Sequence, residues 1–285
     1  MIIYFFKDRS KERIDFGQLI DEYFDKLENT ILSSNDDEFI ATFNLPEFET
    51  SYRYLITKRS RVSSLYRLNP NFVNTFLLCE IPDDIPLFLS RLILKQIEEL
   101  CRIFEFAIYH ERIENIREFN MFELISILEK ERRLYLENNK DVVKYKVDQD
   151  LLNEVCTYQS MIHELPSVVK DDIVANPYIV LKDNNDNVYF SVNWHVGLPT
   201  TFPPQLDFVH IEEEENFVNL VPIQVFYKYT EKLMYEIKDS SIGIKIRYLN
   251  ENASLKARKY IRKMRKSFLS TYKYENIKLI DLIEK

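Results

Sequence analysis

Glycine is almost absent from this chain. Its 285 residues include three glycines, at positions 17, 197 and 243, where average usage would give about 20. Walker loops, dinucleotide-binding loops and the nucleophile elbow of hydrolases each need closely spaced glycines, because their backbone turns with positive φ or approaches a ligand closely. The nearest two glycines, Gly197 and Gly243, are 46 positions apart. These three motifs are therefore excluded.

Cysteine and long apolar runs are also scarce. The three cysteines, Cys79, Cys101 and Cys156, are odd in number and widely spaced, which is typical of reduced core thiols rather than of a disulfide framework. The apolar start ends at Lys7, too early for the apolar region of a signal peptide. No stretch approaches the roughly 18 apolar residues of a membrane span. We expect a cytoplasmic protein without membrane contact, cofactor or metal, since no two histidines share a metal-ligand spacing.

The order of predicted elements indicates an α+β fold. Strand patterns arrive in groups rather than in strict alternation with helices, which favours mixed or antiparallel sheets covered by amphipathic helices. The polar run at 138–141 is the best candidate boundary between two lobes or two small domains. Residues 1–140 then form a β-α-β-β-β-α-β-α lobe, and residues 141–285 form an α-β-β-β-β-α-β-α lobe that ends in a tail.

Local signals place several of these elements. Asp15 caps a helix predicted over 16–32, and Asn120 caps another that starts at the next residue. The strand predicted over 51–60 alternates, so we expect its outer face to meet water. The Asn and Asp residues of 183–187 predict a hairpin turn, because both tolerate the left-handed conformation that glycine usually supplies.

The segment from Trp194 to His210 is the first candidate site. It holds the only Trp, one glycine and three prolines between predicted strands, and a rigid aromatic loop of this kind can line a binding cleft. The alternative is a buried Trp that anchors a Pro-stiffened crossover. His195, Asp207 and His210 are the polar candidates, and an enzyme would bring both histidines to one pocket. Asp207 and His210 are three apart on a strand, so we expect them to face opposite sides.

A basic helix predicted over 253–269 is the second candidate site. Its apolar stripe faces the body, and its opposite side carries seven cations, namely Lys256, Arg258, Lys259, Arg262, Lys263, Arg265 and Lys266. These cations form either a solvated face that pairs with acidic groups nearby or a surface for phosphate or an acidic partner. The acidic run at 212–215 is either a solvated hairpin tip or a docking site for a basic partner.

The charge distribution favours a binding protein. Residues 251–285 carry a net charge of +6, so the remaining 250 residues carry −14 of the total −8. We expect a non-enzymatic intracellular protein that acts through protein–protein contacts. A basic partner would suit its acidic body, as for inhibitors or immunity-type proteins that neutralise toxic nucleases. The alternatives are an enzyme built around the Trp194 to His210 segment and a nucleic-acid-binding module, which the pI near 5.3 disfavours. The oligomeric state stays open.

Overall fold

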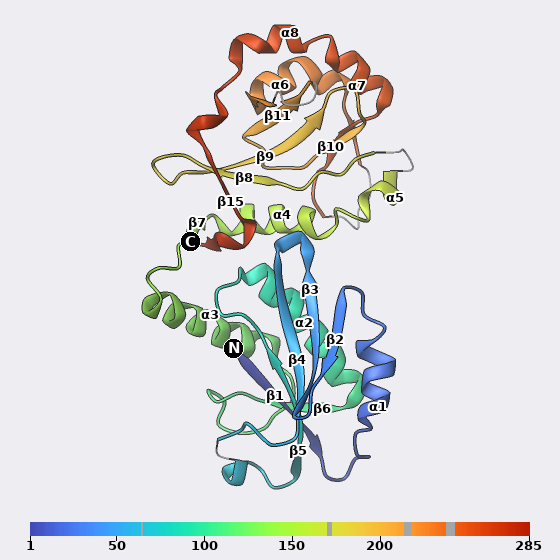
Figure 1. The fold of residues 1–285 in the computed structure, drawn as a ribbon, viewed down its shortest axis with the longest axis vertical. Helices are drawn as coiled ribbons and strands as arrows, with labels where there is room; N and C mark the ends of the chain where they lie inside the picture. Colours follow the sequence, from blue (N-terminus) through green and yellow to red (C-terminus); the bar gives the residue numbers. More distant parts are fainter. Residues whose placement is uncertain (64, 170–172, 214–217, 238–242) are drawn as a thin grey trace. The chain divides into compact units, whose positions relative to one another are not determined.

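The chain has the expected α+β fold, described here from a computed structural model (Figure 1). The structure describes residues 1–63, 65–169, 173–213, 218–237 and 243–285. Contacts divide the chain into two compact units, Met1–Val143 and Lys144–Lys285. Each unit has its own principal sheet and its own core.

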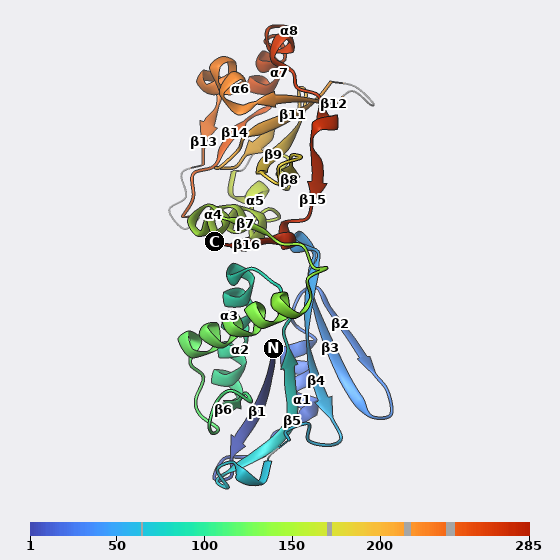
Figure 2. The ribbon, with the colours of Figure 1, turned by 90° about the vertical axis from the view of Figure 1, so that its left-hand side faces the viewer.

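The first unit is built on an antiparallel sheet of six strands in the order β2-β3-β4-β5-β1-β6. The long helices α2 and α3 and several short helical turns accompany it (Figures 1 and 2). The elements are β1 (Ile2–Asp8), α1 (Phe16–Leu19), a π-helix (Ile20–Phe24), β2 (Thr30–Ser34), β3 (Glu38–Leu45), β4 (Thr50–Thr57), β5 (Phe72–Glu80), α2 (Leu87–Phe104), β6 (Phe106–Tyr109) and α3 (Met121–Asn138).

Both faces of this sheet carry a core. On one face, Phe24 packs its ring against Tyr54 of β4, with 5.1 Å between the centroids. On the other face, Leu55 is buried in a cluster with Tyr4 and Phe6. The prediction that the outer face of this strand meets water is therefore correct at Arg53, which is exposed, and wrong from Leu55 onward. Apolar side chains from the connecting loops, including Val62, Leu68 and Ile116, cover that face.

The helix predicted over 16–32 is wrong in its second half. The Asp15 carboxylate accepts hydrogen bonds from the backbone N–H of Gly17 and Gln18, as predicted. Helical structure ends at Phe24, and Thr30–Ser34 forms β2, the edge strand paired with β3. Asn29 takes a left-handed φ of 59° directly before this strand. Apolar residues such as Leu27 and Ile31 continue the helical spacing and so predict the longer helix, but strand pairing with β3 overrides that periodicity.

The second unit contains several sheets. Its principal sheet is mixed, with the order β12-β11-β9-β8-β15, where β9 and β11 are parallel and the other pairs antiparallel. The elements are β7 (Tyr145–Val147), α4 (Gln149–Ser160), α5 (Leu165–Val169), β8 (Ile179–Lys182), β9 (Val188–His195), β10 (Thr200–Phe202), β11 (Phe208–Glu212), β12 (Val218–Pro222), α6 (Ile223–Thr230), β13 (Tyr235–Glu236), β14 (Arg247–Leu249), α7 (Glu251–Arg258), α8 (Ile261–Met264), β15 (Glu275–Ile277) and β16 (Leu282–Glu284).

The C-terminal residues were expected to form a tail, and this expectation is wrong. After α8 the chain crosses the outer face of the five-stranded sheet, adds β15 beside β8, and ends as β16 beside β7 (Figure 2). The apolar pattern of 242–249 predicts a strand over those residues, but β14 begins only at Arg247, and Ile242 lies outside the described residues. The hairpin turn at Asp183–Asn187 is confirmed, with Asp186 at a left-handed φ of 59°.

Two tyrosines of the first unit allow a matched test of its core. The buried Tyr52 hydroxyl has no hydrogen-bond partner among the described residues, whereas the Tyr23 hydroxyl donates to the Gln96 carbonyl at 3.0 Å. Tyr52→Phe is expected to raise the free energy of unfolding by about 1–2 kcal/mol, because it removes an unsatisfied buried group. Tyr23→Phe is expected to lower it. Urea unfolding followed by circular dichroism measures the free energy of unfolding of both variants. A Tyr52→Phe variant less stable than wild type contradicts the expectation.

Candidate functional site

The candidate residues of the Trp194 to His210 segment lie on two neighbouring strands. Because β9 and β11 are parallel, His195 lies opposite Glu212, and His210 lies opposite Asn193. Side chains alternate along a strand, so these four project from one sheet face and Trp194 projects from the other. Of the four, Asn193 and His210 face the C-terminal segment, and Trp194 on the other side faces the helices α6 and α7.

Trp194 is a core residue. Its side chain is fully buried, and its ring lies 5.4 Å from that of Phe226 in α6. The indole Nε1–H donates to the Ser254 hydroxyl of α7 at 3.0 Å. Trp194 therefore anchors a helix to the sheet, as in the alternative of a buried Trp, and it lies away from any surface that a ligand reaches.

Asp207 and His210 do not interact, as their spacing predicts. The Asp207 carboxylate accepts the Phe190 backbone N–H at 2.9 Å, and burial raises the pKa of this carboxyl. His210 is buried and shares a hydrogen bond of 2.8 Å between its Nδ1 and the Ser191 hydroxyl. Burial lowers the pKa of His210 to about 4, so its imidazole is neutral at physiological pH.

The two histidines have different surroundings. His195 Nδ1 lies 2.8 Å from a Glu212 carboxylate oxygen, and both side chains are partly exposed. His210 instead lines a half-open hollow of about 390 Å³, and His195 is not among the residues that line it. His195 and His210 project from the same sheet face, and of the two only His210 lines the hollow. The alternative of an enzyme built around this segment stays a prediction.

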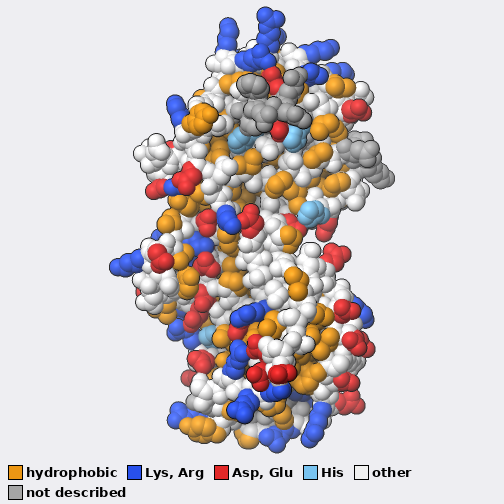
Figure 3. Space-filling model, in the orientation of Figure 1, with side chains coloured by type: hydrophobic (Ala, Val, Ile, Leu, Met, Phe, Trp, Pro, Cys, Tyr) orange, Lys and Arg blue, Asp and Glu red, His pale blue; other side chains and the backbone are white. Residues whose placement is uncertain are grey.

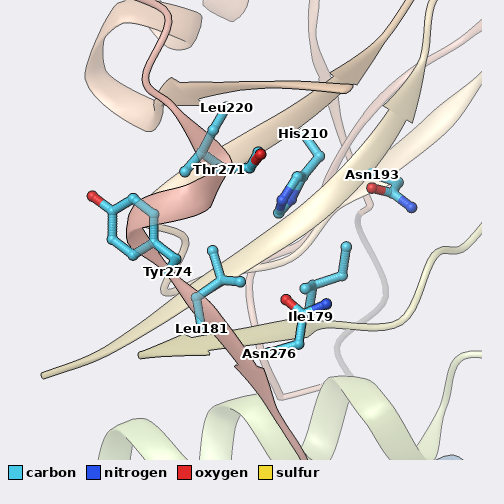
Figure 4. Close-up of a pocket in the computed structure, with 8 residues that line it drawn as sticks. All are labelled: Ile179, Leu181, Asn193, His210, Leu220, Thr271, Tyr274 and Asn276. Carbon is cyan, nitrogen blue, oxygen red and sulfur yellow. The ribbon is translucent and has the colours of Figure 1, made fainter. Parts of the chain in front are cut away.

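The hollow lies between the outer sheet face and the returning C-terminal segment (Figure 4). The strands β8, β9, β11 and β12 contribute one wall, and the other is formed by Thr271, Tyr274 and Asn276. Figure 4 shows the His210 ring pointing into the space between Leu181 and Ile179. Sequence reasoning missed the second wall because it treated residues after 269 as a tail. The signal was present, since 277–283 is too apolar for a solvated tail.

The basic segment, residues 256–266, is not the single helix predicted over 253–269. Helix α7 ends at Arg258 and α8 begins at Ile261. At the break, the Tyr260 N–H donates to the Ala257 carbonyl at 2.9 Å, an i→i−3 bond that tightens the turn. Buried Ala257, Ile261 and Met264 still form one stripe. Its seven cations are all exposed, and Figure 3 shows Lys and Arg side chains gathered over this part of the unit.

Acidic neighbours account for few of these charges. Arg265 pairs with Glu213 at 2.6 Å, and the Lys263 ammonium lies 5.4 Å from the centroid of the Tyr260 ring. Arg265 apart, the cations of the segment have no acidic partner within the ranges that the structure describes. In the acidic run, Glu212 contacts His195 and Glu213 contacts Arg265, while 214–215 lie outside those ranges.

The first unit carries an apolar hollow that sequence reasoning also missed. It measures about 360 Å³, and its lining includes the exposed apolar side chains of Leu65, Tyr66, Val73 and Phe76. Phe76 has a left-handed φ of 59°, a strained conformation for a bulky residue. The sequence marks the neighbouring stretch by its charge, since 51–70 holds five Lys and Arg and no acidic residue. Exposed apolar surface of this kind is typical of a protein contact.

Comparisons with known proteins do not identify the chain. No protein-family model, no curated protein and no solved structure matches it. None of the helices in the described ranges combines the length and the apolar character needed to cross a bilayer. In the same ranges, no group of three or more His, Cys, Asp or Glu side chains is placed to hold a metal ion.

The buried imidazole of His210 predicts acid sensitivity of the second unit. An unfolded histidine titrates near 6.5, and His210 in the folded unit near 4, so below pH 6.5 the unfolded chain binds a proton that the folded chain does not. The free energy of unfolding should fall by about 3 kcal/mol between about pH 6.5 and pH 4 through this group. Above about pH 6.5, His210 does not change the free energy of unfolding with pH.

Urea unfolding followed by the fluorescence of Trp194, which lies in the same unit, measures this loss. His210→Gln is expected to show a loss about 3 kcal/mol smaller than wild type between pH 7 and pH 4. His163→Gln changes an exposed ring and serves as the control. An undiminished loss in His210→Gln would show that this imidazole is not the titrating group.

Proposed function

We propose that this protein is a non-enzymatic binding protein, and that the basic segment is its contact surface for an acidic patch on a protein partner. The observation that carries the proposal is the set of exposed cations without an acidic partner among the described residues. Within eleven positions they present six positive charges on a buried apolar stripe. The stripe holds them in a fixed arrangement, which lowers the entropy cost of ordering them on a partner.

The wider charge distribution favours a protein partner over a nucleic acid. The chain outside residues 251–285 carries a net charge of −14, which repels a long polyanion that approaches broadly. An acidic patch on a protein is limited in extent and can match a segment of eleven residues. Electrostatic complementarity of this kind raises the association rate and selects the partner.

The contact at this segment requires an acidic patch on the partner. The basic partner expected from the acidic body of the chain would contact a different surface. Two carboxylates of the acidic run at 212–215 already have partners within the chain, because Glu212 contacts His195 and Glu213 contacts Arg265. The apolar hollow around Phe76 supports protein binding as well, since exposed aromatic and aliphatic side chains are typical anchors in protein interfaces.

Charge reversal tests the proposal directly. The triple variant Arg262→Glu, Lys263→Glu and Lys266→Glu is expected to lose the partner, because like charges then face its acidic patch. The measurement is affinity purification of tagged wild type and variant from the cells that express the protein, with mass spectrometry of whatever co-purifies in stoichiometric amount. The affinity of the purified pair should fall at least about a hundredfold and depend steeply on salt.

A matched control reverses the same number of charges elsewhere. Lys26, Lys130 and Lys140 are exposed lysines of the first unit, and their change to Glu should leave the partner bound. Purified protein is also titrated with a 20-nucleotide single strand. Tighter binding to this strand than to any recovered protein overturns the proposal, as does a partner retained by the Arg262, Lys263 and Lys266 variant.

A further inference from the structure

The hollow beside His210 has the composition of a ligand site. Its wall contains no Lys, Arg, Asp or Glu among the described residues, although the protein as a whole is rich in charge. One side is apolar, formed by Ile179, Leu181 and Leu220. Figure 4 shows the ring of Tyr274 beside these side chains, with its hydroxyl directed away from His210. A volume of about 390 Å³ lies in the range of small-molecule sites.

The Ser191–His210 pair determines what the imidazole offers to a ligand. Ser191 is fully buried, and its hydroxyl hydrogen bonds to His210 Nδ1 at 2.8 Å. If Nδ1 carried the proton, the serine hydrogen would be left without an acceptor among the described residues, at the cost of an unsatisfied buried donor. The serine therefore donates to Nδ1, and the proton of the neutral ring resides on Nε2. Nε2–H is then a hydrogen-bond donor on the side of the ring that lines the hollow.

Three further polar groups line the hollow without a side-chain partner among the described residues. They are the carboxamides of Asn193 and Asn276 and the hydroxyl of Thr271. Each carboxamide has both a donor and an acceptor, and it can make paired hydrogen bonds with a group of the same kind. The set therefore suits a molecule with adjacent donors and acceptors on one edge and an apolar, flat body.

We propose that this hollow binds a neutral nucleobase or nucleoside. The amide-like edge of a base matches the carboxamides of Asn193 and Asn276, in the way that asparagine reads base edges in other proteins. The His210 Nε2–H donates to a carbonyl or ring nitrogen, and the base plane lies against the Tyr274 ring and the aliphatic wall. The uncharged wall provides no counter-charge for phosphate, so nucleosides bind better than nucleotides.

Calorimetric titration of the full-length protein tests the site with adenosine, guanosine, cytidine and uridine. At least one is expected to bind saturably, and its 5′-monophosphate at least about tenfold more weakly. Asn193→Leu keeps the side-chain size and removes the carboxamide, and it should weaken binding about tenfold. Asn276→Ala removes the second carboxamide at an exposed position of β15, and it should also weaken binding about tenfold.

The control is Asn185→Ala, which removes an exposed carboxamide at the β8–β9 turn, outside the hollow. It should bind as wild type does, and circular dichroism confirms that each variant is folded. The proposal is overturned if no nucleoside binds, if Asn193→Leu and Asn276→Ala both bind as tightly as wild type, or if the monophosphate binds more tightly than the nucleoside. It is also overturned if maltose, a neutral sugar, displaces the nucleoside.

Discussion

The second unit depends on the cover that its own C-terminal segment places over the five-stranded sheet. That face carries Leu181, Phe208 and Leu220, which would otherwise be in water. The chain covers them by a backbone bond from Leu269 to Leu220 at 2.8 Å and by the ring of Tyr274, whose centroid lies 5.3 Å from that of Phe208. The same crossing forms the second wall of the hollow. A hydrophobic requirement of the sheet therefore creates the candidate ligand site.

The opposite face of that sheet sets the position of the basic segment. Trp194 is buried there and donates to Ser254 in α7, and the stripe of Ala257, Ile261 and Met264 continues the contact past the helix break. The cations on the outer side are thus held by packing rather than by ion pairs. Exposed ion pairs contribute little to stability, so these charges can be used for a partner at small cost to the fold.

Scarcity of glycine shapes the backbone elsewhere. Asn29 and Asp186 take left-handed conformations that both residue types tolerate. Phe76 takes one too, where β5 has two more residues than β1 between the pairs Tyr4–Leu78 and Phe6–Asn74. The Asn74 side chain accepts the Phe76 N–H at 2.7 Å and supports this bulge. A bulky residue in such a conformation costs about 1–3 kcal/mol, and here the result is an aromatic side chain at the rim of the apolar hollow.

Local chemistry was enough to predict the features that depend on neighbours in the chain. These are the α+β class, the caps at Asp15 and Asn120, the turn at Asp183–Asn187 and the exposed face of the basic segment, because each rests on a hydrogen bond or a periodicity within a few residues. Long-range pairing decided the rest. Residues 30–34 became a strand because β3 offered an edge, and residues 275–277 did so because β8 offered one. The Ser191–His210 and Trp194–Ser254 bonds join residues 19 and 60 positions apart, and only the folded sheet brings such partners together.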